Sequence, residues 1–360
     1  MSPLDVTTGG GGWILARADQ DAADEVVPRI EEVDDCFAKP PGTFNFPYRL
    51  DCGYVVVPEF HKRESETTLK LAFLRINSGK GSTRSPLFIL AGGPGESDIK
   101  SDTFLLFQKP LLGSILDERD IVLLDQRGAG HSEPLLDCPE LYSLPWVAIE
   151  KGLDDSGTAA LQVAAVQRCI TGFEAMGLDM NAFNSLESAA DVDAARRALG
   201  YDRIIYYGGS YAAQLGQHVV REYPGILEGV VLDGASALSR KSWMDDRALD
   251  AQWSIDNLTK LCEADVKCRV AYDIPRLVSE ALALFGDGTR TYDYVDPADP
   301  KINFKLNLTK ADLVNLLYAK QSTAIGTFSL PAILEQLNKG GIGTMLKILV
   351  RRTGARCCST

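Results

Sequence analysis

The chain has 360 residues, 45% of them hydrophobic and 24% charged, and a formal net charge of −12 at pH 7. This composition is that of a globular protein with a large core, and the negative charge argues against nucleic acid or an anionic membrane surface as a partner. No stretch approaches the roughly 20 apolar residues that a membrane-spanning helix needs.

The first 35 residues are predicted to be a disordered leader or the product of a misassigned start. They include a run of glycines from Gly9 to Gly12, and their longest apolar run is Trp13-Ile14-Leu15. A signal peptide needs an apolar region of about 7 to 15 residues, so none is predicted here.

Strands follow in the next part of the chain. The stretches from Cys52 to Pro58 and from Thr67 to Asn77 predict an antiparallel hairpin, with His61 facing solvent between them. Continuous apolar runs predict buried strands at Pro86 to Leu90 and at Asp120 to Asp125, parallel to each other because a right-handed crossover joins them.

Helices alternate with the later strands. They are expected at 103–112, at 157–175 and from Ser188, where Asp191 completes a capping box, to Leu199 before Gly200. Further strands are predicted at 204–207 and 229–233. Strands alternating with helices predict a doubly wound α/β fold with a mostly parallel sheet over 36–237, and helices dominate from 238 onward.

A candidate nucleophile, Ser210, lies between one of these strands and the helix that follows it. The sequence Gly208-Gly209-Ser210-Tyr211-Ala212 matches the G-x-S-x-G elbow except that alanine replaces the last glycine. Glycines suit a strained turn where strand and helix pass closely, and a helix start favours anionic species. An ordinary glycine turn is the alternative interpretation.

A glycine-rich loop follows the strand at 86–90. Its sequence, Ala91-Gly92-Gly93-Pro94-Gly95, leaves backbone N–H groups without side-chain cover, as an oxyanion hole requires. A plain Gly-Pro turn is the alternative.

These stretches together resemble the α/β-hydrolase family of proline iminopeptidases and, more closely, the tripeptidyl-aminopeptidase-like hydrolases. The motifs that carry the resemblance occur in order: AGGPG, LLDQRGAGHSEP, NSLESAADVDAARRALG, YYGGSYAAQLG, EYP and VVLDG. The resemblance implies that Ser210 attacks a peptide or ester carbonyl and that the N–H groups of Tyr211 and Gly93, or Gly92, hold the oxyanion. It implies a small peptide or ester substrate, no cofactor and no metal.

The resemblance also implies a helical cap inserted over the active site, expected at 238–350. Peptidases of this kind bind the substrate amine through cap carboxylates. Asp245, Asp246 and Glu263 lie in the corresponding region.

A serine nucleophile also needs a base and a carboxylate that orients the base. In this fold the histidine comes late in the chain, yet the last one here, His218, lies eight residues after Ser210, about 12 Å along one helix. His131 is a minor candidate for a substitute base and Asp233 for the acid, and ordinary structural roles are the alternatives.

The simplest account is that the chain lacks the last two strands of the fold, which carry the acid and the histidine. Residues 351–360 have no periodicity and match nothing in the family, as a frameshift or premature stop would produce. Alternatives to the aminopeptidase-like hydrolase are therefore an esterase on the same fold and a non-catalytic fragment or pseudoenzyme.

The eight cysteines fall in locally spaced pairs. Cys36 with Cys52, Cys138 with Cys169 and Cys262 with Cys268 flank loops as disulfides would, whereas free buried cysteines are the alternative. Only three histidines and no C-x-x-C pair are present, which argues against zinc. Disulfides, together with the resemblance, imply a secreted or extracytoplasmic protein.

Overall fold

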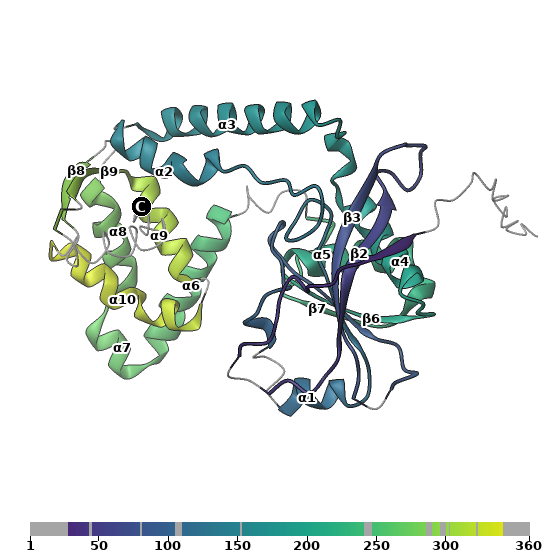
Figure 1. Cartoon of the computed structure of the whole chain (residues 1–360). Coiled ribbons are helices and arrows are strands. Elements are labelled where there is room, and N and C mark those ends of the chain that lie inside the picture. Colours follow the sequence, from purple (N-terminus) through teal and green to yellow (C-terminus); the bar gives the residue numbers. More distant parts are fainter. Residues whose placement is uncertain are drawn as a thin grey trace, which may run out of the picture.

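The computed structural model describes residues 28–42, 45–79, 81–104, 110–151, 153–240, 247–285, 290–295, 300–301, 303–321 and 323–340. A twisted sheet with helices against it occupies one side of the molecule in Figure 1, and a group of helices from the second half of the chain lies beside it.

Seven strands form the main sheet in the order β1-β2-β3-β5-β4-β6-β7. Their bounds are β1 Arg29–Glu32, β2 Leu50–Pro58, β3 Thr68–Ile76, β4 Leu87–Leu90, β5 Ile121–Leu124, β6 Ile204–Gly209 and β7 Leu227–Asp233. The predicted β2–β3 hairpin is antiparallel and the predicted β4–β5 pair is parallel, as are β4–β6 and β6–β7. The doubly wound, mostly parallel sheet is confirmed.

Strand β1 corrects the prediction of a disordered leader that reaches residue 35. Its residues Arg29–Glu32 are mostly exposed and show no apolar alternation, so the sequence carries no strand signal there. The strand exists because it pairs with β2, where Gly53 faces the carbonyl of Glu31 and a Cβ would overlap that oxygen. The pairing partner, and not local propensity, orders this segment.

The helices of the first part are α1 Pro110–Leu116, α2 Glu140–Glu150, α3 Asp155–Ala175, α4 Ser185–Ala198 and α5 Tyr211–Glu222. Helix α3 agrees with its prediction. Helix α1 is described from Pro110 to Leu116, whereas it was expected at 103–112, and residues 105–109 lie outside the described residues. Helix α4 begins three residues earlier than expected because Asn184, not Ser188, caps it, accepting from the N–H groups of Leu186 and Glu187.

The second half contains α6 Arg247–Ala264, α7 Val266–Ala271, α8 Ile274–Phe285, β8 Arg290–Val295, β9 Asn303–Leu308, α9 Lys310–Gln321 and α10 Ala324–Asn338. We call these elements the helical unit. The helices agree with the prediction, but the antiparallel pair β8–β9 was missed. Helix α2 contacts β9 although it belongs to the first half of the chain. Residues 351–360, with Cys357 and Cys358, lie outside the described residues.

Two separate cores result. In the sheet, one face packs Phe88 and Tyr206 against Val192 of α4 and Leu215 of α5, and the other face packs around Leu74, Phe104 and Leu116. The helical unit has its own core, which includes Leu277, Phe285, Leu313 and Leu334. Strand β7 forms one edge of the described sheet, with Val231 48% exposed.

Candidate active site

Ser210 occupies a strained turn between β6 and α5. Its φ of +54° and ψ of −119° place a non-glycine residue in a sparsely populated region, and no other described non-glycine residue has a positive φ. The N–H group of Ser210 donates to the carbonyl of Asp233 at 2.8 Å. Its side chain is exposed and caps no helix N–H group, so the hydroxyl is free for chemistry.

The close packing beneath this turn explains which glycines the elbow needs. A Cβ on Gly208 would overlap the carbonyl oxygen of Ala212, which also accepts from the Tyr206 hydroxyl at 2.6 Å. One turn further along α5, a Cβ on Gly216 would lie 2.5 Å from Leu232 and 2.7 Å from Tyr206. Ala212 itself is fully buried. The departure from the G-x-S-x-G pattern is therefore accommodated, because the tightest contacts fall on Gly208 and Gly216.

The glycine-rich loop after β4 lies against Ser210. A Cβ on Gly92 would lie 3.1 Å from the Ser210 Cβ and 3.6 Å from its Oγ. Gly93 has a φ of +103°, which favours glycine. The N–H groups of Gly92 and Gly93 donate to no described residue, and that of Tyr211, the first residue of α5, has no partner within its helix. Free N–H groups and the serine thus meet at the carboxyl ends of β4 and β6.

His61 was predicted to face solvent, and this prediction is wrong. Its Nε2 lies 2.8 Å from Asp191 Oδ1, its side chain is only 12% exposed, and its backbone N–H group donates to Glu187. Asp191 also accepts two bonds from the Arg127 guanidinium, each of 2.7 Å. Burial alone would raise the pKa of Asp191, but the charge and hydrogen bonds of Arg127, with the bond from His61, outweigh it and lower that pKa.

His131 lies on the loop after β5 and is bound to Asp125. Its backbone N–H group donates to Asp125 Oδ2 at 2.8 Å, and its Nδ1 lies 3.2 Å from the same oxygen. Its ring packs against Phe37, which contacts Tyr54 of β2. The Asp125 oxygen that binds His131 also accepts from the hydroxyl of Ser97, and β5 and β6 are two positions apart in the sheet.

His218, the third histidine of the chain, is on α5 and its Nδ1 lies 3.2 Å from Arg221 Nη2. Burial, and then the charge of Arg221, lowers its pKa. None of the three histidines forms a hydrogen bond with Ser210 in the described structure.

Asp233 ends β7 beside the elbow. Its Oδ2 accepts from the Tyr207 hydroxyl at 2.9 Å, and this bond, followed by burial, raises the pKa of Tyr207. Its carbonyl holds the Ser210 N–H group. Both contacts brace the elbow, which gives Asp233 a structural role in this geometry.

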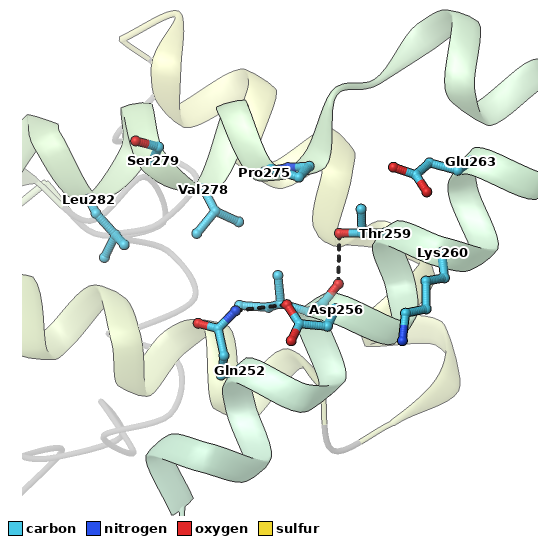
Figure 2. Close-up of a pocket in the computed structure, with 10 residues that line it drawn as sticks. Gln252, Asp256, Thr259, Lys260, Glu263, Pro275, Val278, Ser279 and Leu282 are labelled. Atoms are coloured by element: carbon cyan, nitrogen blue, oxygen red, sulfur yellow. Dashed lines mark hydrogen bonds between the residues drawn. The ribbon is translucent and has the colours of Figure 1, made fainter.

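A groove of about 560 Å³ lies in the helical unit, and all its lining residues come from α6 and α8. Figure 2 shows Gln252, Asp256 and Lys260 of α6 on one side and Val278 and Leu282 of α8 on the other. Glu263, predicted as a cap carboxylate, lines this groove. Asp245 and Asp246, predicted with it, lie outside the described residues.

All three predicted disulfides are present: Cys36–Cys52, Cys138–Cys169 and Cys262–Cys268. Within the described ranges, no helix is both long and apolar enough to cross a bilayer. The same residues contain no cluster of three or more histidine, cysteine, aspartate or glutamate side chains arranged to hold a metal ion.

The sheet order and the strand–serine–helix elbow are those of an α/β hydrolase. Residues 85–300 match the family described as alpha/beta hydrolase fold, and the chain belongs to this family. The resemblance drawn from the sequence motifs is confirmed at this level.

Two curated relatives specify the similarity further. The tripeptidyl aminopeptidase of Streptomyces coelicolor is 29% identical over 232 residues, which cover 61% of this chain and 42% of that protein. The serine protease Hip1 of Mycobacterium tuberculosis is 28% identical over 260 residues, which cover 70% of this chain and 48% of that protein. The chain thus spans about half the length of the curated relatives that it matches.

Among solved structures, a proline iminopeptidase-related protein from Thermus thermophilus is 22% identical, with 51% of this chain and 43% of that chain covered and a TM-score of 0.29.

Proposed function

We propose that this chain is a serine hydrolase of the aminopeptidase type, with Ser210 as its nucleophile. The observation that carries the proposal is the strained φ of +54° at an exposed serine that begins a helix. Strain of this kind persists where function requires it, because a turn with ordinary dihedrals would not present the hydroxyl in the same way. The names of the two relatives support peptides as substrates.

The oxyanion hole in this proposal consists of the N–H groups of Tyr211 and of Gly93, with Gly92 beside them. These N–H groups have no partner in the described structure, and they belong to the loop after β4 and to the first residue of α5, next to Ser210. When Ser210 Oγ bonds to the acyl carbon, its proton passes to a base and the carbonyl oxygen becomes negative. Donors placed in advance for that charge contribute about 10²- to 10³-fold each.

None of the three histidines forms a hydrogen bond with Ser210 in the described structure, where His61 binds Asp191, His131 binds Asp125 and His218 contacts Arg221. This observation favours a second candidate, a binding role without turnover for the chain by itself. The two candidates differ in one measurable respect, which is whether the Ser210 hydroxyl reacts as a nucleophile.

Fluorophosphonate labelling of the folded chain separates these candidates, with Ser210→Ala as the test variant. Ser239→Ala is the matched control, because Ser239 is an exposed serine outside the elbow. We expect labelling of the wild type and of Ser239→Ala, and none of Ser210→Ala. A folded wild type that stays unlabelled would refute the hydrolase proposal for this chain and leave the binding role.

Gly92→Ala tests the oxyanion hole. The added methyl group would lie 3.1 Å from the Ser210 Cβ and 3.6 Å from its Oγ, next to the hydroxyl that the substrate carbonyl has to reach in this proposal. We expect at least about a 10²-fold loss of labelling rate. Gly225→Ala is the control, because a Cβ there meets no atom within 4 Å. Equal rates for the two variants would contradict the assignment.

The proposed function also concerns the role of the helical unit, the class of substrate and the location of the protein. We propose that the helical unit is the cap, with Glu263 in its groove as the candidate for binding a substrate amine. Hydrolysis of a tripeptide anilide, compared with that of a simple acyl ester, decides between a peptidase and an esterase. The three disulfides support an extracytoplasmic location.

A further inference from the structure

The glycine-rich loop beside Ser210 is attached to the rest of the molecule at its two ends. At the first end, Gln126 Nε2 donates to the carbonyl of Ala91 at 2.8 Å, and both residues are buried. At the second end, the hydroxyl of Ser97 donates to Asp125 Oδ2 at 2.9 Å, and this bond is buried too. Two consecutive residues of the β5 loop thus hold both ends of the loop after β4.

Between these anchors the loop has no other hydrogen bonds within the described structure. Residues 92–96 neither donate to nor accept from any described residue, and Gly93 and Gly95 have φ values of +103° and +99°. A segment with two glycines in the left-handed region has a large choice of backbone conformations, so its position depends on what holds its ends.

The anchoring residues are themselves fixed to the sheet. The N–H group of Asp125 donates to the carbonyl of Ala72 in β3 at 2.9 Å. The hydroxyl of Ser132 donates to the Asp125 carbonyl and accepts from the N–H group of Ala72. Asp125 is buried, with only 1% of its surface exposed. The residue that holds Ser97 is therefore itself held to strand β3 by hydrogen bonds.

We propose that Gln126 and Asp125 are positioning residues, which set the distance between the free N–H groups of the glycine-rich loop and Ser210. This inference rests on the proposed function of that loop as the oxyanion hole. Gln126 acts through the Ala91 carbonyl, one residue before Gly92, and Asp125 acts through Ser97. A shift of about 1 Å at a catalytic group costs roughly 10²-fold in rate, so small losses of anchoring are measurable.

The test uses Gln126→Ala and Gln126→Glu in the full chain. The alanine variant removes the donor, and the glutamate variant places a carboxylate against the Ala91 carbonyl. Gln217→Ala is the matched control, because Gln217 also donates from a side-chain amide to a backbone carbonyl, that of Ser236 at 2.7 Å, away from the loop.

Phosphonylation kinetics give the first readout. We expect the maximal labelling rate to fall at least about tenfold in both Gln126 variants, with the concentration for half-maximal rate changed less than about twofold. The control is expected to stay within about twofold in both quantities. Gln126 variants with wild-type rates would overturn the inference.

Limited proteolysis gives a second readout that needs no catalysis. We expect a glutamate-specific protease to cut after the exposed Glu96 at least about tenfold faster in Gln126→Ala and in Ser97→Ala, whereas cutting after Glu118, an exposed residue outside the loop, stays unchanged. A purely structural role would instead speed cutting at both sites. If the wild type is unlabelled, the proposed function fails in this chain, and unchanged cutting after Glu96 would still overturn the positioning role by itself.

Discussion

Removal of the buried ion pair between Arg127 and Asp191 is expected to lower the thermal stability of this protein. The two side chains are 1% and 4% exposed and form two hydrogen bonds of 2.7 Å. Arg127 also donates to the carbonyls of Glu59 and Ala182. Arg127→Ala would leave the Asp191 carboxylate buried with only His61 beside it, along with two carbonyls without their donor.

Removal of one partner from such a pair costs about 3–5 kcal/mol of unfolding free energy. At about 2–4 °C per kcal/mol for a unit of 150–250 residues, the expected fall in Tm is about 6–20 °C. Arg168→Ala is the control, because its ion pair with Glu140 is 58% and 47% exposed, and exposed pairs contribute about 1 kcal/mol or less.

Thermal unfolding followed by circular dichroism measures both variants under the same conditions. The double variant Arg127→Met/Asp191→Leu is expected to recover part of the loss, since it leaves no unpaired charge. If Arg127→Ala lowered Tm no more than Arg168→Ala does, the buried pair would contribute no more to stability than an exposed pair, which would refute this reasoning.

Three other predictions concern stability. Tyr206→Phe removes the hydrogen bond to the Ala212 carbonyl and should lower the free energy of unfolding, measured with urea, by about 1 kcal/mol. The disulfide Cys138–Cys169 joins residues 31 apart in the sequence, and Cys262–Cys268 joins residues 6 apart. Replacing both cysteines of a pair by serine should therefore lower the free energy of unfolding by about 3.7 kcal/mol for the first pair and about 2.2 kcal/mol for the second. The lowered pKa of Asp191 stabilises the fold above about pH 4, and this contribution is lost as pH falls further. The Tm of Asp191→Asn should therefore lie below that of the wild type at pH 7 and approach it below pH 4.

The sequence alone predicted the elements whose signals are local. Apolar runs at β4, β5 and β6 and the helical spacing after Ser210 identified strand, turn and helix correctly. The elbow was visible for the same reason, because the strained turn needs glycine at Gly208 for contacts only a few residues away. Cysteine pairs were also predictable, since their partners lie close in sequence.

Features that depend on distant partners could not be predicted in this way. Strand β1 is ordered by β2, about 20 residues later, and its own residues are polar. His61 was expected in solvent because its neighbours in sequence are charged, yet Asp191 of α4, 130 residues later, buries it. Ser188 and Asp191 fitted a capping box, but Asn184 starts the helix and Asp191 pairs with Arg127.

The segment Asp125-Gln126-Arg127 shows why the site and the stability of the fold are linked. Its three consecutive side chains point to three different partners: Asp125 to Ser97, Gln126 to Ala91 and Arg127 to Asp191. The turn after β5 allows this because consecutive side chains leave the backbone in different directions. Loss of the Arg127 anchor is therefore expected to loosen the backbone that carries Gln126. Protonation or removal of Asp191 is expected to shift the glycine-rich loop while the sheet is still folded.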